Sequence, residues 1–349
     1  MSYFPADYHT ARQNFCDQAA KLGWRQESYP VGQDLSIDVA IKTAAPDKST
    51  IIVSSGLHGG EGFFGSAVQL ALLNSDALAP DLNWVFIHAL NPYGFANLRR
   101  CNEDNIDLNR NFLLPNEEYQ GSSPIYGKIS SLLNPERMGK IDLFLPKMLG
   151  AIAKYKLANI WQAVAEGQYD FPQGLFFGGQ AASKTQQILQ EYLPQWVGDS
   201  PNILHLDFHT GLGKWGTYKL LMDTVVTPAE LLQLQTYFGV ESIVASDGGE
   251  KKYQVRGSIG QWIRQLLQPY NYNYFCAEFG TYSFAKVLLL LRQENYVHHR
   301  LATTDPVYLR TKEQMQEVFC PKSDQWQTTV ISKSIKIVAQ ADLAVRKLG

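Results

Sequence analysis

Short apolar runs rich in β-branched and aromatic residues alternate along the chain with stretches of helical periodicity. The runs predict strands at 36–41, 51–55, 84–90, 203–208, 218–222 and 274–279. Apolar residues three and four positions apart predict helices over 63–73, 7–21, 183–192, 228–238, 258–268 and 284–294. This alternation indicates an α/β fold, a three-layer sandwich around a central mixed, mostly parallel sheet.

The chain shows one long interruption in this alternation. No internal repeat or low-complexity linker divides the 349 residues, so we expect one domain over 1–349. The segment 113–195 is helix-prone and carries proline and glycine near its ends. We therefore expect it to be an insertion between core strands that shapes the rim of a pocket.

Composition and charge indicate which kind of molecule the protein binds. Hydrophobic residues make up 45% of the chain, and the formal net charge is −2, which favours neither nucleic acid nor an anionic membrane surface. A small molecule or peptide is the better expectation. The N-terminus lacks an apolar signal region, which predicts a cytoplasmic protein. The four cysteines form no C-x-x-C pair, which argues against disulfides and thiolate metal sites.

Titratable residues follow several of the predicted strands. His58 and Glu61 lie in GLHGGEG after the strand 51–55, and a polar stretch of 22 residues, 91–112, follows the strand 84–90. His209 and Glu278 lie at the ends of two further strands. Because ligands gather at the carboxyl ends of strands in open α/β sheets, we expect these side chains to meet.

Two imidazoles and a carboxylate are typical ligands of a catalytic zinc ion that keeps one position open. His58, Glu61 and His209 supply this set for one Zn²⁺, and the glycines around His58 permit a tight backbone path. Such an ion activates water, and Glu278, outside the ligand set, is the expected general base. Arginines of the 91–112 stretch are expected to bind a carboxylate and an oxyanion.

Five motifs occur in one order along the chain. They are H-x-x-E (His58, Glu61), N-P-x-G (Asn91, Pro92, Gly94), D-L-N-R-N (Asp107 to Asn111), D-x-H-T (Asp207, His209, Thr210) and E-F-G-T (Glu278 to Thr281). Together they resemble the zinc carboxypeptidase family, carboxypeptidase A-like, and most closely a bacterial branch whose members carry a domain of unknown function. The resemblance spans about residues 50–285.

The resemblance implies roles for individual residues. His58, Glu61 and His209 would bind zinc, and Glu278 would be the catalytic base. Asn109 and Arg110 would hold the C-terminal carboxylate of a substrate, and Arg100 would lie at the oxyanion. Asp107 would hydrogen-bond the far nitrogen of His58, and Asp207 would do the same for His209.

Some assignments stay open at this point. Either Arg99 or Arg100 can be the oxyanion residue, and Tyr253 is a possible tyrosine that caps the substrate. Lys251, Lys252 and Arg256 predict a basic pocket that favours acidic side chains. Arg110 has an alternative reading as a structural arginine paired with Asp104 or Asp107. His205 and His88 fall inside apolar runs and are expected in the core, and Cys276 is assigned to packing.

The favoured function is a zinc-dependent carboxypeptidase that acts on a small peptide or peptide-like substrate. One rival is a deacylase of N-acyl amino acids, since the chain also resembles aspartoacylase and succinylglutamate desuccinylase relatives in its H-x-x-E, D-L-N-R and D-x-H elements. The other is a non-catalytic protein that binds peptide carboxylates. The oligomeric state and the identity of the substrate are not indicated by the sequence.

Overall fold

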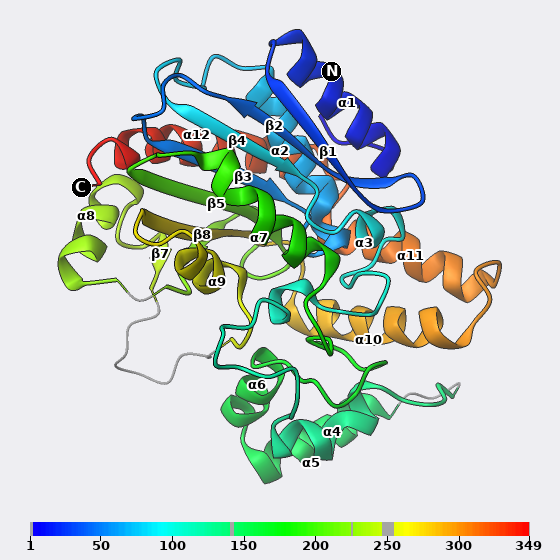
Figure 1. Cartoon of the computed structure of the whole chain (residues 1–349). Helices are drawn as coiled ribbons and strands as arrows, with labels where there is room; N and C mark the ends of the chain where they lie inside the picture. The colour runs from blue at the N-terminus through cyan, green and yellow to red at the C-terminus, as the bar shows by residue number, and fades with distance from the viewer. Residues whose placement is uncertain (1–2, 140–142, 225, 246–254, 349) are drawn as a thin grey trace.

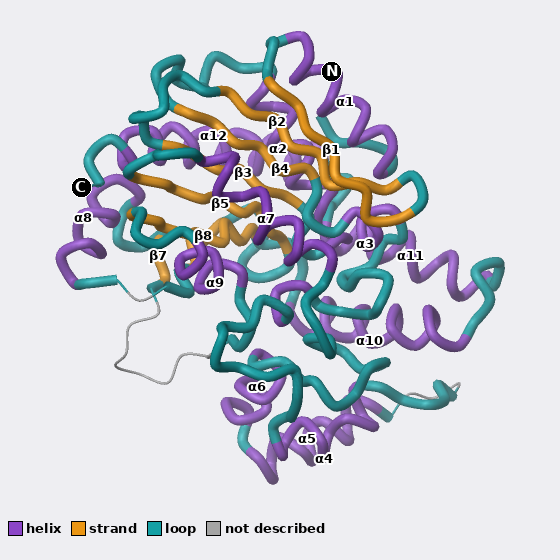
Figure 2. The backbone as a smooth tube through the Cα atoms, viewed as in Figure 1, coloured by secondary structure: helices purple, strands orange, loops and turns teal. Residues whose placement is uncertain are grey.

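A computed structural model describes residues 3–139, 143–224, 226–245 and 255–348. Its centre is an eight-stranded sheet in the order β1-β2-β4-β3-β5-β8-β6-β7. Figure 2 shows the strands as one continuous sheet between helices. The strands are β1 (Arg25–Gly32), β2 (Leu35–Lys42), β3 (Thr50–Ser55), β4 (Asn83–His88), β5 (Asn202–Thr210), β6 (Tyr218–Leu221), β7 (Ile243–Val244) and β8 (Asn271–Phe279).

The middle of the sheet is parallel and its flanks include antiparallel pairs. Strands β4, β3, β5 and β8 pair in parallel, as do β6 and β7. The pairs β1–β2, β2–β4 and β6–β8 are antiparallel. The predicted α/β class and mixed sheet are confirmed. The predictions omitted β1, an edge strand with mostly exposed or half-exposed residues, and β7, which has only two residues.

Helices cover both faces of the sheet because each central strand is apolar on both sides. Val53 and Phe86 belong to one core cluster with α1 (Tyr8–Lys21), α2 (Gly62–Leu73), α8 (Pro228–Phe238) and α12 (Asp324–Val345). Ile52 and Val85, one position away on the same strands, face α7 (Lys184–Val197) and α9 (Ile259–Leu266). This alternation produces the three layers that the apolar runs predict.

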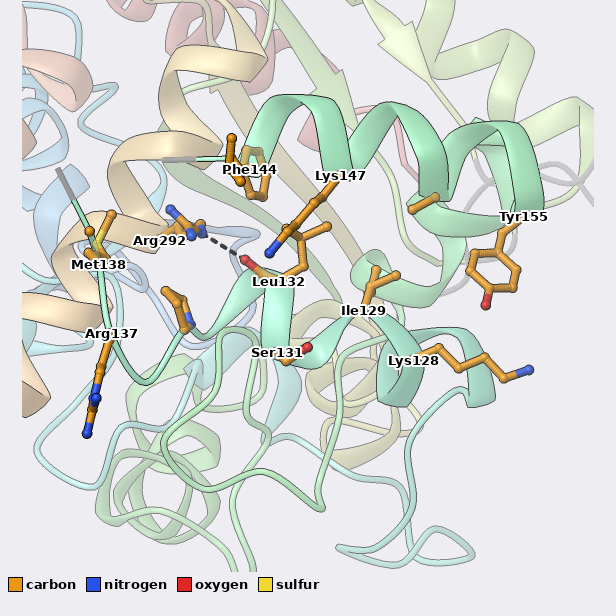
Figure 3. A pocket seen from close by; sticks show the side chains of 14 residues that line it. Lys128, Ile129, Ser131, Leu132, Arg137, Met138, Phe144, Lys147, Tyr155 and Arg292 are labelled. Atoms are coloured by element: carbon orange, nitrogen blue, oxygen red, sulfur yellow. Dashed lines mark hydrogen bonds between the residues drawn. The ribbon is translucent and has the colours of Figure 1, made fainter. Parts of the chain in front are cut away.

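A third cluster lies beside the sheet. Its apolar side chains come from α4 (Pro124–Leu133), α5 (Phe144–Tyr155), α6 (Leu157–Ala165), α10 (Phe284–Arg300) and α11 (Pro306–Phe319). Figure 1 shows these helices on one side of the sheet. Arg292 of α10 donates a hydrogen bond from Nε to the carbonyl oxygen of Leu132, at 2.8 Å, and its guanidinium lies over the ring of Phe144 (Figure 3). None of the described helices is both long and apolar enough to cross a membrane.

The expected insertion at 113–195 therefore has two structural parts. Helices α4 to α6 stand apart from the sheet, whereas α7 packs on it through Leu189, Leu193 and Trp196. Helix α7 has an apolar face, and this face packs on the sheet.

Candidate active site

The loop between β3 and α2 packs closely against α3 (Pro92–Ala96) and the segment that follows it. A Cβ atom on Gly59 would lie 2.1 Å from the carbonyl carbon of Gly94, so only glycine fits there. Gly59 donates its N–H to the carbonyl oxygen of Arg100 at 3.2 Å, and Gly60 donates to that of Arg99 at 2.6 Å. This close contact fixes Arg100 beside His58.

His58, Glu61 and His209 converge at the carboxyl ends of the neighbouring strands β3 and β5. Their relative exposures are 5%, 3% and 2%, and one potential ligand atom from each lies within 4.8 Å of the others. The Nδ1 atom of His58 is buried and has no hydrogen-bond partner among the described residues. Two imidazole nitrogens and a carboxylate oxygen in this arrangement fit a zinc ion.

Asp207 fixes the orientation of the His209 ring. His209 Nε2 lies 2.6 Å from Asp207 Oδ2, which leaves Nδ1 to face Glu61 Oε2 at 3.0 Å. Burial acts to lower the pKa of His209, but the carboxylates of Asp207 and Glu61 outweigh it and raise that pKa well above its usual value. Ser54 and Tyr274 donate hydrogen bonds to Asp207 at 2.6 and 3.1 Å.

Ser54 and Tyr274 were not predicted as part of the site. Each lies in an apolar strand, and strand alternation alone does not reveal that their hydroxyl groups share one carboxylate. The signal that was available is a polar residue within the buried run of β3. His205, which was expected in the core, is fully buried and contacts Ser54 Oγ and the hydroxyl of Tyr272, both at 2.7 Å.

The surroundings of His58 differ from those of His209. Asp107 Oδ1 lies 3.4 Å from His58 Nδ1, and neither atom makes a hydrogen bond with the described residues, although the sequence resemblance implied one. Arg100 donates from Nε to Asp107 Oδ2 at 2.8 Å and places Nη2 2.8 Å from His58 Nε2. Burial, together with the Arg100 cation and His209, lowers the pKa of His58 well below its usual value.

The structure distinguishes the two adjacent arginines. Arg100 Nη1 lies 3.7 Å from Glu61 Oε1, at the convergent triad. Arg99 is 1% exposed and directs its guanidinium elsewhere, to Glu294 at 2.9 Å and Asn105 at 2.8 Å. Arg99, which was predicted as a residue that contacts the substrate, is held through Nε and Nη2 by these two partners, and its buried Nη1 has no hydrogen-bond partner among the described residues.

Glu278 lies beside the triad, opposite His209 in the β5–β8 register. The backbone N–H of Leu212 donates to Glu278 Oε1 at 2.9 Å. Burial, and next the charge of Glu61, raises the pKa of Glu278 to about 7. The half-buried Cys276 approaches Glu278 Oε2 with its Sγ at 3.9 Å, so this cysteine lines the site as well as packing in it.

Asn109 and Arg110 lie on the short helix η2 (Leu108–Arg110), next to the start of α9. Asn109 Oδ1 accepts a hydrogen bond from the Ile259 N–H at 3.1 Å. Arg110 is 7% exposed, and its Nε has no hydrogen-bond partner in the part of the chain that the structure describes. No described carboxylate lies within ion-pair distance of Arg110, so the alternative pairing with Asp104 or Asp107 is not formed.

The remaining predicted residues lie at the edge of the site or beyond the described ranges. Arg256 stacks over the ring of Tyr169 at 4.4 Å and donates to the carbonyl oxygens of Gln120, at 3.0 Å, and of Glu118. Tyr253, Lys251 and Lys252 lie outside the described residues. Of the predicted basic pocket, the described part is thus one arginine directed at the 118–120 loop.

Comparison with solved structures extends the likeness to the whole fold. The structure is similar to that of carboxypeptidase A from Helicoverpa armigera, with a TM-score of 0.52 and 13% identity over 98% of this chain and 75% of that chain. It is also similar to bovine thrombin-activatable fibrinolysis inhibitor in complex with tick carboxypeptidase inhibitor, with a TM-score of 0.53 and 10% identity over 99% of both chains. The predicted carboxypeptidase A-like fold is confirmed.

Sequence comparison gives a family without an assigned activity. No curated protein matches this sequence. The family model described as "Protein of unknown function (DUF2817)" matches residues 4–333, which is nearly the entire chain. The chain therefore belongs to the DUF2817 family, with the fold of the zinc carboxypeptidases.

Proposed function

We propose that this protein is a zinc-dependent hydrolase of amide bonds, acting as a carboxypeptidase on a small peptide or peptide-like substrate with a free carboxylate. The observation that carries the proposal is the buried guanidinium of Arg110, whose charge acts on His58 of the triad. This guanidinium donates from Nη1 to the carbonyl oxygen of Asn109 at 2.7 Å, and no carboxylate lies at ion-pair distance from it among the described residues. A buried cation that lacks an anionic partner is unfavourable, and a substrate carboxylate would supply that partner.

His58, Glu61 and His209 would hold the zinc ion. When bound, zinc supplies Lewis acidity toward a carbonyl oxygen and toward water. Asp207 would keep the His209 ring in one orientation through its 2.6 Å contact with Nε2. Two imidazole nitrogens among the three donors favour zinc over a harder cation such as Mg²⁺ or Ca²⁺, because these harder cations prefer oxygen ligands.

Glu278 would move the proton in the reaction. Its Oε1 is held by the Leu212 N–H, whereas Oε2 has the weaker thiol donor of Cys276 at 3.9 Å. Oε2 would therefore accept a proton from the attacking water and deliver it to the leaving amine. A pKa of about 7 suits both steps, since the carboxyl then exchanges a proton readily near neutral pH. The water that attacks and the amine that leaves would thus share one proton carrier.

Two arginines would divide the charges of the substrate. Arg100, anchored by Asp107, would donate to the oxyanion that develops on the scissile carbonyl. Arg110 would bind the terminal carboxylate together with the amide N–H₂ of Asn109, whose oxygen is already occupied by the Ile259 N–H. This division requires that the substrate end in a free carboxylate one residue beyond the scissile bond.

The test is the substitution Glu278→Gln in the zinc-loaded full chain. We expect kcat on N-blocked dipeptides to fall by roughly a thousandfold or more, while zinc remains near one equivalent by elemental analysis. Glu313→Gln, at an exposed position of α11, is the matched control and should keep wild-type turnover. Full activity of the Glu278→Gln variant would refute this mechanism, and hydrolysis of N-acyl amino acids in place of dipeptides would make the protein a deacylase.

A further inference from the structure

The insertion at 113–195 reaches the candidate active site at Arg110. Gly167 and Tyr169, which follow α6, lie directly against this residue. A Cβ atom on Gly167 would lie 2.6 Å from Arg110 Cδ and 2.9 Å from Cγ, so the aliphatic part of the arginine fills the place of a side chain. The hydroxyl of Tyr169 donates a hydrogen bond to the carbonyl oxygen of Arg110 at 2.7 Å. Both the side chain and the backbone of Arg110 therefore contact the insertion.

Tyr169 is held in place by other parts of the insertion. It is 3% exposed, and its N–H donates to the carbonyl oxygen of Gly121 at 3.0 Å. The preceding residue, Gln168, forms isolated bridges with Ser122 and Phe177. Burial raises the pKa of the Tyr169 hydroxyl, which keeps this group protonated and able to donate. The hydroxyl is thus a hydrogen-bond donor at a fixed place.

A second segment, which precedes α9, closes around the same two residues. The guanidinium of Arg256 lies 4.4 Å from the centroid of the Tyr169 ring. A Cβ atom on Gly257 would lie 2.2 Å from the carbonyl oxygen of Arg110, which is the acceptor of the Tyr169 hydroxyl. The carbonyl oxygen of Gly257 accepts a hydrogen bond at 3.1 Å from the N–H of Phe112, two residues beyond Arg110. Two segments that are far apart in the sequence therefore enclose this carbonyl group.

The guanidinium of Arg110 depends on this support because little else fixes it. Among the described residues, its hydrogen-bond acceptor is the carbonyl oxygen of the neighbouring Asn109, at 2.7 Å, and its buried Nε has none. A long side chain keeps several rotamers unless its stem is packed. The contact with Gly167 packs the stem, and the contact with Tyr169 fixes the backbone from which the stem starts. A change at Tyr169 would thus displace the guanidinium without removing its charge.

We propose that Tyr169 is a positioning residue, which fixes Arg110 in the orientation that binds the terminal carboxylate of a substrate. The inference rests on the proposed function, and it makes the insertion a part of the substrate-binding site. Tyr169 itself would not touch the substrate, because its hydroxyl is used by the backbone of the protein. Its effect would be on a contact that is present both in the bound substrate and in the transition state, so its loss would raise KM and leave kcat almost unchanged.

The first test is Tyr169→Phe, which removes the hydroxyl and keeps the ring that Arg256 contacts. In the zinc-loaded protein we expect KM for N-blocked dipeptides to rise about 5- to 10-fold, and kcat to change by less than about twofold. Tyr126→Phe is the matched control, because the buried Tyr126 of α4 also donates from its hydroxyl to a backbone carbonyl, that of Leu175, at 2.6 Å. The control should lose a similar amount of stability and keep the wild-type KM. An unchanged KM in Tyr169→Phe, or an equal rise of KM in both variants, would overturn the proposal.

A double-mutant cycle shows whether Tyr169 acts through Arg110. The substitution Arg110→Met removes the guanidinium that Tyr169 is proposed to position. In this background, adding Tyr169→Phe should change KM by less than about twofold, because nothing is left to displace. The same rise of KM as in the wild-type background would mean that Tyr169 acts on the site by another route, which contradicts the proposal.

A binding measurement separates this inference from the proposed function. Titration calorimetry of the zinc-loaded Glu278→Gln variant with N-acetylglycyl-leucine and with its C-terminal amide needs no turnover. We expect tighter binding of the free carboxylate, and a loss of about 5- to 10-fold in this preference when Tyr169→Phe is added but not when Tyr126→Phe is added. This result supports the inference even if the wild-type protein hydrolyses no peptide, in which case only the proposed function fails. Equal binding of the two peptides, or a preference that Tyr169→Phe leaves unchanged, contradicts the inference even if dipeptides are cleaved.

Discussion

Asp207 and His209 occupy alternate positions on β5, and Asp207 Oδ2 lies 2.6 Å from His209 Nε2. The contact selects Nδ1 as the nitrogen that faces Glu61, so one residue of the strand positions another. Asp207 itself accepts hydrogen bonds from Ser54 and Tyr274, which come from the two strands beside β5. The orientation of the proposed ligand is therefore set by three adjacent strands rather than by the loop that follows β5.

The substitution Asp207→Asn should weaken zinc binding by about 10- to 100-fold, because the ring of His209 loses a charged partner that fixes its orientation and basicity. Competition with a chromophoric chelator measures the affinity. Asp76→Asn, at an exposed position after α2, is the control and should bind zinc as the wild type does. Equal affinities for Asp207→Asn and the wild type would remove Asp207 from the metal site.

The substitution Arg110→Met should lower kcat/KM for peptides with a free C-terminal carboxylate by about 100-fold or more, since a buried, bidentate arginine–carboxylate contact is lost. Steady-state kinetics should show the loss mainly as a raised KM, because the contact is present both in the bound substrate and in the transition state. Arg110→Lys keeps the charge but not the fork, and should recover only part of the loss. A variant with unchanged KM would leave Arg110 a structural residue.

The order of motifs predicted that His58, Glu61 and His209 meet, because the first two lie in the loop after β3 and His209 lies at the end of β5, and parallel strands bring their carboxyl ends together. The sequence could not show which of Arg99 and Arg100 points toward the triad. Both follow α3 in an irregular segment without periodicity, and their directions depend on Glu294, almost two hundred residues later in the chain.

Helices α11 and α12 were also missing from the predictions. Both mix polar and apolar residues, and each buries one stripe, which includes Met315 and Val318 in α11 and Ile337 and Val338 in α12. Such helices gain most of their stability from the surface on which they pack, and that surface becomes known only when the fold is known.

The substitution Glu294→Gln should lower the free energy of unfolding by about 3–5 kcal/mol. Glu294 is buried between Arg99 at 2.9 Å and Lys312 at 2.5 Å, and its removal leaves two buried cations without an anion. Urea unfolding at pH 7.5 measures the change, with Glu313→Gln as the exposed control. The triple variant Arg99→Met, Glu294→Leu, Lys312→Met should recover much of the stability. A loss below about 1 kcal/mol in Glu294→Gln would show that the network contributes little.

Asp223 gives a pH dependence of stability whose sign follows from the direction of its pKa shift. Its pKa rises from 3.8 to about 6 in the folded protein, so the folded state binds more protons than the unfolded state between these pH values. The unfolding free energy therefore falls as pH rises through this window, by up to about 3 kcal/mol from this one group. Asp223→Asn removes this contribution, because the asparagine side chain does not titrate.

The measured quantity is the difference in unfolding free energy between Asp223→Asn and the wild type, taken from urea denaturation at several pH values between 4 and 7.5. The difference should grow in favour of the variant as pH rises from about 4 to 6, and it should be constant above about pH 7. Asp76→Asn should show no such trend. A difference that does not change with pH would mean that the pKa of Asp223 is the same in the folded and the unfolded protein.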